Sequence, residues 1–159
     1  MAAIVPPARR VKDYPDFSAK INRQDMTVGR YLRLYKHVGE PLGWDQRLKM
    51  APTELEAYLS SKNCLLFVLT VDGNEVGFCE FDQSEYPIFQ LMNFGLVTQV
   101  QGRGLGSYLL DFSLRAAFAA GAKKINLHTD TQDHPLAQSV YKKAGFVVES
   151  QSWQDAEGL

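Results

Sequence analysis

A glycine-rich segment in the second half of the chain is the clearest candidate for chemistry. It reads Gln101-Gly102-Arg103-Gly104-Leu105-Gly106-Ser107 and lies between a strand-like apolar run and a helix-like one. At such a junction, unpaired N–H groups and the positive end of the helix dipole point at one place. Glycine lets the backbone approach a ligand closely and adopt positive φ angles. The segment therefore predicts an anion site, although a glycine-rich loop that only turns the chain has the same pattern.

Two well-known phosphate-binding loops do not fit this segment. A nucleoside triphosphate loop ends in Gly-Lys-Ser or Gly-Lys-Thr, but here Ser107 follows Gly106 directly, without a Lys. A dinucleotide loop needs an acidic residue about 20 positions further on, a role open to Asp130, and then more βα units. Only 29 residues follow Asp130, too few for the rest of that sheet, so we exclude this class of site.

Three further side chains are candidates for moving a proton or positioning an acceptor. Glu80 lies in an apolar strand-like run, where a carboxylate is paired, held protonated or turned to solvent at an edge. It is our first candidate for a general base, acting directly or through water. His128 alternates with Ile125 and Leu127, so it either faces the active cleft of the protein or is a structural histidine. Asn93 either orients an acceptor or bonds its strand neighbours.

Helical periodicity predicts the first elements that hold these residues. Apolar residues follow Thr27, a candidate N-cap, at helical spacing as far as Gly39. A second, shorter helix begins at Pro52 and ends near Ser60. A long helix is predicted from Leu105 to Gly121, with a core face made of Leu105, Leu109, Phe112, Ala116 and Ala119.

Apolar runs of strand length predict a sheet between and after these helices. A tight-turn signal at residues 72–74 joins the first two strands, and a last helix begins at Pro135 and ends at Gly145. The predicted strands are residues 64–71, 75–82, 88–97, 124–129 and 146–151. The resulting fold class is α/β, with a mixed, mostly antiparallel central sheet and helices on both faces.

Composition limits the domain organisation and the kinds of partner. Hydrophobic residues make up 45% and charged residues 22% of the 159 residues, as in a single folded domain. We expect an irregular arm over residues 1–22 and one domain over residues 23–159. A net charge of -1 argues against nucleic acid as a partner. Cys64 and Cys79 lie in apolar runs and are expected to be buried free thiols. With no apolar run long enough to span a membrane, we expect a cytoplasmic protein and no membrane partner.

Two motifs at a fixed separation resemble the GNAT superfamily of acyl-CoA-dependent N-acyltransferases. The first is Gln-x-x-Gly-x-Gly over residues 101–106, and the second is Val140-Tyr141-Lys142-Lys143-Ala144-Gly145-Phe146. The resemblance spans roughly residues 31–150 and includes the strand that ends in Phe94-Gly95-Leu96-Val97. The run from Leu127 to Pro135 is similar to an uncharacterised bacterial subgroup of that superfamily.

This resemblance implies a site for acetyl-CoA, the acyl donor. Main-chain groups of Gly95, Leu96 and Val97 are expected to bond the pantetheine arm and polarise the carbonyl, and the turn from Gly102 to Ser107 to hold the pyrophosphate. Many members carry Asn seven residues before the tyrosine, where this chain has His134, which puts contacts at that helix start in doubt. The full set of expected contacts is Gly95, Leu96, Val97, Gln101, Gly102, Arg103, Gly104, Leu105, Gly106, Ser107, His134, Ala137 and Tyr141. Arg103 is either a phosphate clamp or a solvated loop charge.

The resemblance also implies a reaction. Tyr141 takes the family's general-acid position, since a phenol is protonated at neutral pH and can protonate a leaving thiolate, although a core tyrosine is the alternative. The expected catalytic residues are thus Tyr141, Glu80 and His128, with no metal, because no Cys/His cluster has metal-ligand spacing. The predicted function is transfer of an acetyl group to a primary amine in a direct ternary complex. A non-catalytic acyl-CoA-binding regulatory module is the alternative.

A third hypothesis is an interaction scaffold built on the first two helices. It depends on the aromatic residues Tyr31, Tyr35 and Trp44, which more simply line an acceptor pocket or the core. The acceptor itself cannot be read from the sequence, and a homodimer by edge pairing of the last strand stays an option.

Overall fold

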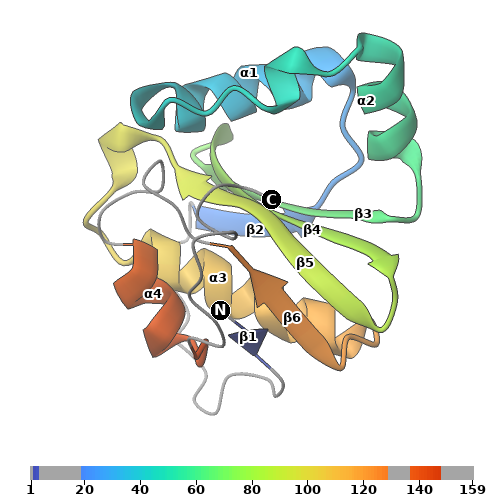
Figure 1. Cartoon of the computed structure of the whole chain (residues 1–159). Coiled ribbons are helices and arrows are strands. Elements are labelled where there is room, and N and C mark those ends of the chain that lie inside the picture. The colour runs from blue at the N-terminus through green and yellow to red at the C-terminus, as the bar shows by residue number, and fades with distance from the viewer. Residues whose placement is uncertain (1, 4–18, 129–136, 148–159) are drawn as a thin grey trace.

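The structure, a computed structural model, describes residues 2–3, 19–128 and 137–147 of the chain (Figure 1). The helices and strands in chain order are β1 (Ala2–Ala3), β2 (Ala19–Arg23), α1 (Val28–Gly39), η1 (Glu40–Leu42), η2 (Arg47–Lys49), α2 (Pro52–Ser60), β3 (Cys64–Val71), β4 (Asn74–Glu85), β5 (Ile88–Leu96), η3 (Thr98–Val100), α3 (Leu105–Ala119), β6 (Lys124–Leu127) and α4 (Ala137–Lys143).

The strands form one mixed sheet in the order β1-β6-β5-β4-β3-β2. Neighbours from β2 to β5 are antiparallel, β6 is parallel to β5, and β1 is antiparallel to β6. The parallel pair requires a crossover, and α3 supplies it between β5 and β6. The tight turn before β4 has positive φ angles of 52° at Asp72 and 81° at Gly73, as the hairpin signal predicts.

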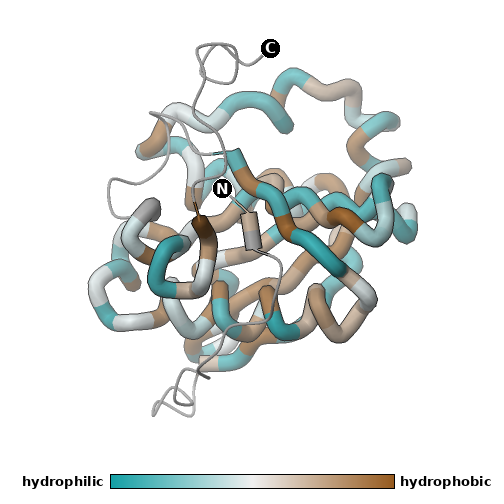
Figure 2. The backbone as a smooth tube through the Cα atoms, turned by 60° about the horizontal axis from the view of Figure 1, so that its bottom comes forward, coloured by the Kyte–Doolittle hydropathy of each residue, from teal (hydrophilic) through white to brown (hydrophobic). Residues whose placement is uncertain are grey.

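Helices cover both faces of this sheet, as predicted. α1 and α2 lie on one face, and α3 and α4 lie on the other (Figure 1). On the first face, the ring of Tyr31 in α1 meets Phe78 of β4 at a centroid distance of 6.0 Å. On the second face, Phe112 of α3 meets Phe67 of β3 at 5.9 Å. In Figure 2, hydrophobic segments alternate with hydrophilic ones along the elements, because each turns one side toward the core.

The expectation of an irregular arm over residues 1–22 is wrong for two parts of it. Ala2–Ala3 pairs with β6, and Ala19–Arg23 pairs with β3 along its whole length. Within β2, Ala19 and Ile21 are buried while Lys20 and Asn22 are exposed, which is the alternation of an edge strand. The strand has only five residues and follows a Pro- and charge-rich stretch, so its alternation is too short to give a clear signal in the sequence.

The predicted core face of α3 is also partly wrong. Phe112 is 38% exposed and Ala119 is exposed, whereas Ser113 and Ala117 are fully buried. Small side chains at these positions let the helix approach the sheet closely, so the buried stripe is rotated away from the bulky Phe112. The described apolar residues buried on α3 are Leu105, Leu109, Leu110, Leu114 and Ala117.

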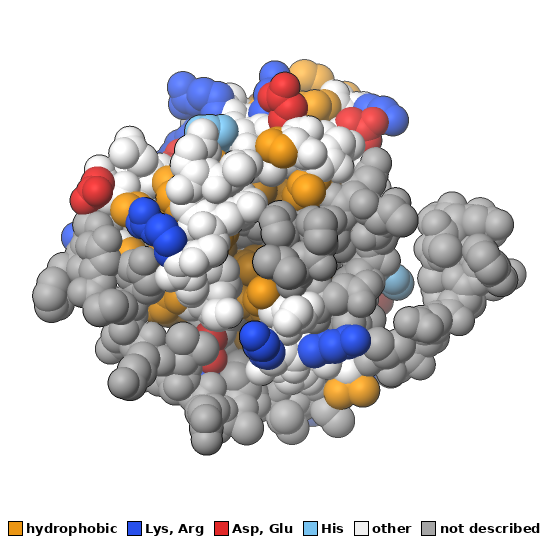
Figure 3. Space-filling model, turned by 90° about the vertical axis from the view of Figure 1, so that its left-hand side faces the viewer, with side chains coloured by type: hydrophobic (Ala, Val, Ile, Leu, Met, Phe, Trp, Pro, Cys, Tyr) orange, Lys and Arg blue, Asp and Glu red, His pale blue; other side chains and the backbone are white. Residues whose placement is uncertain are grey.

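Two further expectations concern a membrane span and the charge of the surface. Among the helices described, none combines the length and hydropathy that crossing a membrane requires. On the face shown in Figure 3, Lys and Arg side chains stand among Asp and Glu side chains along the upper edge, without a field of one sign there. The predicted helix start at Pro135 and the last strand beyond Val147 lie outside the described residues.

Candidate active site

The sheet opens along the second half of β5. Pairing with β6 runs from Ile88 opposite Lys124 to Leu91 opposite Leu127, and β6 ends there. Opposite β4, the register shifts so that Glu80 faces Asn93 while the next residue faces Leu91, which leaves Met92 as a bulge. From Met92 to Leu96, β5 has no partner on the β6 side among the strands described. We call this segment the open edge of β5.

The glycine-rich turn lies beside the open edge. Gly102 and Gly104 have φ angles of 80° and 79°, and Gly104 is the N-cap of α3. No side chain caps this helix and its first turn holds no acidic residue, so the first N–H groups face outward. A Cβ atom added at Gly102 or Gly104 meets nothing within 4 Å, so the turn is open on the side to which a side chain at these positions would point. The arrangement is that of an anion-binding helix start.

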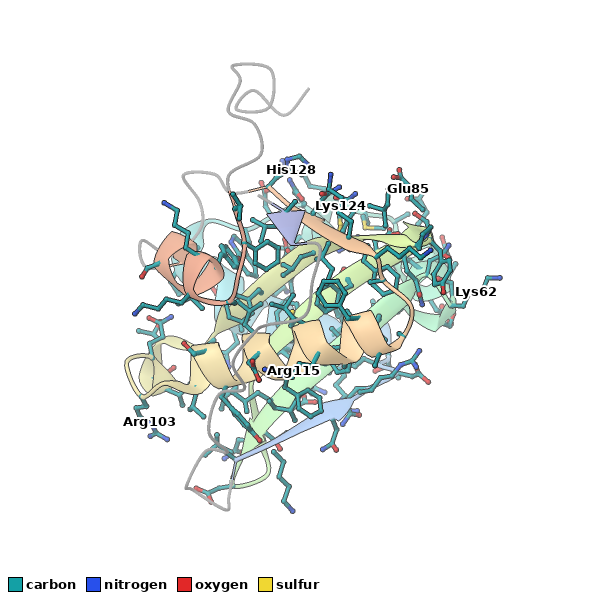
Figure 4. The ribbon with its side chains drawn as sticks, turned by 90° about the horizontal axis from the view of Figure 1, so that it is seen from below. Lys62, Glu85, Arg103, Arg115, Lys124 and His128 are labelled. Carbon is teal, nitrogen blue, oxygen red and sulfur yellow. The ribbon has the colours of Figure 1, made fainter. Side chains whose placement is uncertain are left out.

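Neighbouring side chains hold the turn against β5. The side-chain amide of Gln101 donates to the carbonyl oxygen of Leu96 at 3.1 Å, and Leu105 is fully buried. A Cβ at Gly106 lies 3.6 Å from the side chain of Leu96, in ordinary contact. Arg103 is exposed and points outward at the tip of the turn (Figure 4). Gln101 and Leu105 therefore position the turn, while Gly102 and Gly104 shape its open side.

The main-chain groups predicted to contact the acyl donor are not equally free to form new hydrogen bonds. The N–H of Val97 donates to the carbonyl oxygen of Val76 at 2.7 Å, so the sheet already uses this donor. Gly95 is required for packing, since a Cβ there lies 2.6 Å from Val38 Cγ1 of α1. The backbone of Gly95 and Leu96 lies on the open edge, where it faces no further strand among the residues described.

Tyr141 reaches the open edge from the face that α3 and α4 cover. Its side chain is only 3% exposed, and its ring lies 5.8 Å from the ring of Phe94 and 5.8 Å from that of Phe146. Because Phe94 belongs to the open edge, α4 places the tyrosine next to it. Ala137 is the first residue of α4, and His134 lies outside the described residues.

Glu80 is the centre of a buried polar network on the opposite face. Its side chain is 0% exposed, so the solvent-facing alternative is wrong. Oε1 accepts a hydrogen bond from the hydroxyl of Tyr31 and another from Asn93 Nδ2 at 3.1 Å. Oε2 accepts one from Arg47 Nη2 and forms an ion pair with it. Three donors, one of them cationic, therefore surround the Glu80 carboxyl group.

Arg47 enters this network from the short η2 segment between α1 and α2. Its guanidinium carbon lies 4.8 Å from the centre of the Tyr58 ring, and Nη1 contacts the sulfur of Met50 at 3.2 Å. Its backbone N–H donates to the hydroxyl of Tyr35 at 3.3 Å. Burial lowers the pKa of Arg47, but electrostatic interactions with Glu80 and Tyr31 and hydrogen bonds to them together outweigh it and raise the pKa overall, so the side chain stays charged.

The tyrosines around Glu80 stay protonated. Burial, and then the negative charge of Glu80, raise the pKa of Tyr31 well above that of an ordinary phenol. The same two causes, in the same order, raise the pKa of Tyr58. Tyr31 is therefore held as a hydrogen-bond donor to Glu80 and not as a phenolate.

Glu80 and Tyr141 approach the open edge from opposite faces. Asn93 and Phe94 are adjacent residues of β5, and side chains of adjacent strand residues point to opposite faces. Asn93 contacts Glu80, whereas Phe94 contacts Tyr141. His128 follows the end of β6 and is exposed (Figure 4). The structure thus brings two of the three proposed catalytic residues to one segment, from its two sides.

Sequence reasoning missed Arg47. It lies in a polar stretch without periodicity, and the chain holds 17 Lys and Arg residues. The available signal was Glu80 itself, because a carboxylate among apolar strand residues needs a cationic partner if it is ionised. That signal predicts that a partner exists and does not say which residue it is.

Comparisons with known proteins find acetyltransferases that are similar to this chain. A model described as the acetyltransferase (GNAT) family matches residues 31–146. The chain is 36% identical over 78 residues to a mycothiol acetyltransferase of Corynebacterium glutamicum strain R, which covers 48% of this chain and 26% of that protein. The chain therefore spans about a quarter of the length of the curated relatives it matches, 26% in each case.

Solved acetyltransferase structures share the fold at low sequence identity. An aminoglycoside acetyltransferase from an uncultured soil metagenomic sample, in complex with sisomicin, has a TM-score of 0.71 and 17% identity over 86% of this chain and 93% of its own. The aminoglycoside N-acetyltransferase AAC(6')-Iy in complex with CoA has a TM-score of 0.64 and 18% identity over 84% and 91%. The ribosomal-protein-S18-alanine N-acetyltransferase of Escherichia coli has a TM-score of 0.64 and 16% identity over 80% and 76%.

Proposed function

We propose that this chain, which belongs to the acetyltransferase (GNAT) family, transfers an acetyl group from acetyl-CoA to a primary amine in a ternary complex. The observation that carries the proposal is the start of α3. There, two glycines with positive φ angles, open on the side to which a side chain would point, lead into uncapped N–H groups directly beside the open edge of β5. A helix start of this kind suits the pyrophosphate of CoA.

The open edge supports the placement of the acyl group. In the antiparallel ladder Val97 bonds to Val76, so Leu96 is the residue whose N–H points away from β4, and this N–H offers a hydrogen bond to an extended arm such as pantetheine. The arm then runs between the face that carries Tyr141 and the face that carries Glu80. A similar fold has been solved with CoA, which is consistent with this use of the site.

The positions of Tyr141 and Glu80 on opposite faces of the sheet support separate roles for them as proton donor and proton acceptor. In our proposal the amine nitrogen attacks the thioester carbonyl carbon, and the carbon–sulfur bond then breaks. Tyr141 donates its proton to the leaving sulfur, which yields the CoA thiol. The proton lost by the attacking nitrogen passes to Glu80, directly or through water. His128, at the end of β6, is the alternative acceptor of that proton.

Acetyl-CoA binding is tested at Gly104 with a matched control. Gly104→Glu adds bulk and negative charge where the anion is proposed to lie, so we expect it to abolish acetyl-CoA binding in calorimetry. Gly73→Glu is the control, because Gly73 has a similar φ angle of 81° and equally open surroundings, but lies in the β3–β4 turn. Its affinity should match that of the parent. Equal affinity in both variants would show that the pyrophosphate binds elsewhere.

Turnover is tested by measuring CoA thiol release with a panel of primary amines, including alkyl amines, polyamines and aminoglycosides such as sisomicin. Release that depends on one of these acceptors supports the enzyme. Tight acetyl-CoA binding without acceptor-dependent release from any of them supports the alternative, a non-catalytic acyl-CoA-binding module.

A further inference from the structure

The guanidinium of Arg47 lies in surroundings that suit a bound ammonium ion. One side is the Glu80 carboxylate, through Oε2, and another is the face of the Tyr58 ring, 4.8 Å from the guanidinium carbon. The sulfur of Met50 lies 3.2 Å from Nη1. A carboxylate and an aromatic face are the two groups by which proteins recognise organic cations. The surroundings of the guanidinium thus have the chemistry of a cation site, and Arg47 is the cation that they hold.

Arg47 is partly exposed, whereas Glu80 is fully buried: their side chains are 12% and 0% exposed. On the other carboxylate oxygen, Tyr31 is fixed within α1 and Asn93 by its pairing opposite Glu80 in the β4–β5 ladder.

Withdrawal of the guanidinium requires rotation of the Arg47 side chain and no movement of its backbone. Arg47 lies in the three-residue 3-10 helix η2, where its own N–H stays bonded to the Tyr35 hydroxyl at 3.3 Å. Its long, flexible side chain can therefore leave Glu80 when another cation takes its place.

We propose that Arg47 occupies the place of the acceptor's ammonium group, and that a cationic amine displaces its guanidinium from Glu80 to bind. This inference rests on the proposed function, because it names the class of acceptor and its contact in that same site. The exchange leaves one cation beside one carboxylate, so the buried charge of Glu80 is compensated before and after it. These surroundings then select acceptors whose ammonium group can lie against both the Glu80 carboxylate and the face of the Tyr58 ring.

The test removes Arg47 and asks whether an external cation replaces it. Arg47→Ala leaves a cavity and an unpaired carboxylate, so butylammonium should raise its melting temperature by about 3–6 °C at roughly ten times the dissociation constant. 1-Butanol, which has the same stem without the charge, should have no such effect. If Arg47→Ala is unfolded alone, butylammonium and not 1-butanol should restore the folded state.

Two variants serve as controls for a general effect of the added cation on stability. Arg47→Lys keeps a cation beside Glu80 and should not respond to butylammonium. Arg30→Ala breaks another ion pair between α1 and β4, in which Arg30 Nε lies 2.8 Å from Glu75, and should not respond either. An equal response of Arg47→Ala to butanol and butylammonium, or no response to either, overturns the proposal.

A kinetic measurement separates this site from a purely structural ion pair. Arg47→Met removes the competitor but keeps an apolar stem, so the KM for a cationic acceptor should fall several-fold while the KM for acetyl-CoA is unchanged. A structural role predicts a lower kcat or a higher acceptor KM, and either result overturns the proposal. The butylammonium experiment needs no turnover, so failure of the proposed function and failure of this site are distinguishable.

Discussion

Replacing Arg47 by methionine should destabilise the protein strongly, because it leaves a buried carboxylate without its cation. Glu80 is 0% exposed and Arg47 is 12% exposed, so little solvent screens the pair. Breaking a buried pair from one side costs about 3–5 kcal/mol. For a chain of this size, that loss lowers the melting temperature by about 6–20 °C.

Urea denaturation of four proteins tests this magnitude: the parent, Arg47→Met, Glu80→Gln and the double variant. In Glu80→Gln the side-chain amide keeps an acceptor for Tyr31 and Asn93 but needs no cation, so the double variant should recover much of the loss. We expect a coupling free energy of about 2 kcal/mol or more between the two substitutions.

The exposed pair on the same two elements is the control for this cycle. The Arg30–Glu75 side chains are 37% and 24% exposed, so Arg30→Met should cost about 1 kcal/mol or less. Equal losses in Arg30→Met and Arg47→Met, or strictly additive effects of the Glu80 and Arg47 substitutions, would refute the view that burial makes this ion pair important.

Three other predictions concern protons. Tyr141→Phe should lower kcat by roughly 10- to 1000-fold in the thiol-release assay, while its affinity for acetyl-CoA stays within a few-fold of the parental value. If the variant turns over like the parent, the hydroxyl of Tyr141 has a structural role. Glu80→Gln should lower kcat/KM in that assay by roughly tenfold or more while His128→Gln keeps it near the parental value, and the reverse pattern would assign the base to His128. Burial first, and then Glu80, raise the pKa of Tyr58, so above about pH 10 the unfolded chain loses phenolic protons that the native state keeps. Urea midpoints should therefore fall as the pH rises beyond that value, and less so in Tyr58→Phe.

Local signals in the sequence were sufficient for most elements of the fold. Thr27 accepts a hydrogen bond from Arg30 N at 3.3 Å as the N-cap of α1, as its position before the apolar residues predicts. The signal of Asp72-Gly73 gives the hairpin turn, because both residues adopt positive φ angles. Such features depend on residues close in sequence, so they can be read without the tertiary structure.

Features that depend on packing between distant elements were predicted less well. The buried side of α3 is set by how closely Ser113 and Ala117 let it approach the sheet, and not by its largest apolar residue, Phe112. The strand at Ala19–Arg23 exists because β3 offers a partner, and its own five residues carry little periodicity. Tertiary contacts outweigh local preference in both cases.

For the candidate site, the sequence alone determined the glycine turn, but it left open whether Glu80 is paired, protonated or exposed. Positive φ angles at Gly102 and Gly104 follow from residue type and from their place between a strand and a helix. Only the tertiary structure decided that Arg47, 33 residues from Glu80, is the partner of this carboxylate, and that Glu80 and Tyr141 flank β5 from opposite faces. The physical reason is that compensation of a buried charge depends on distance in space, which the chain sets only when its helices pack on the sheet.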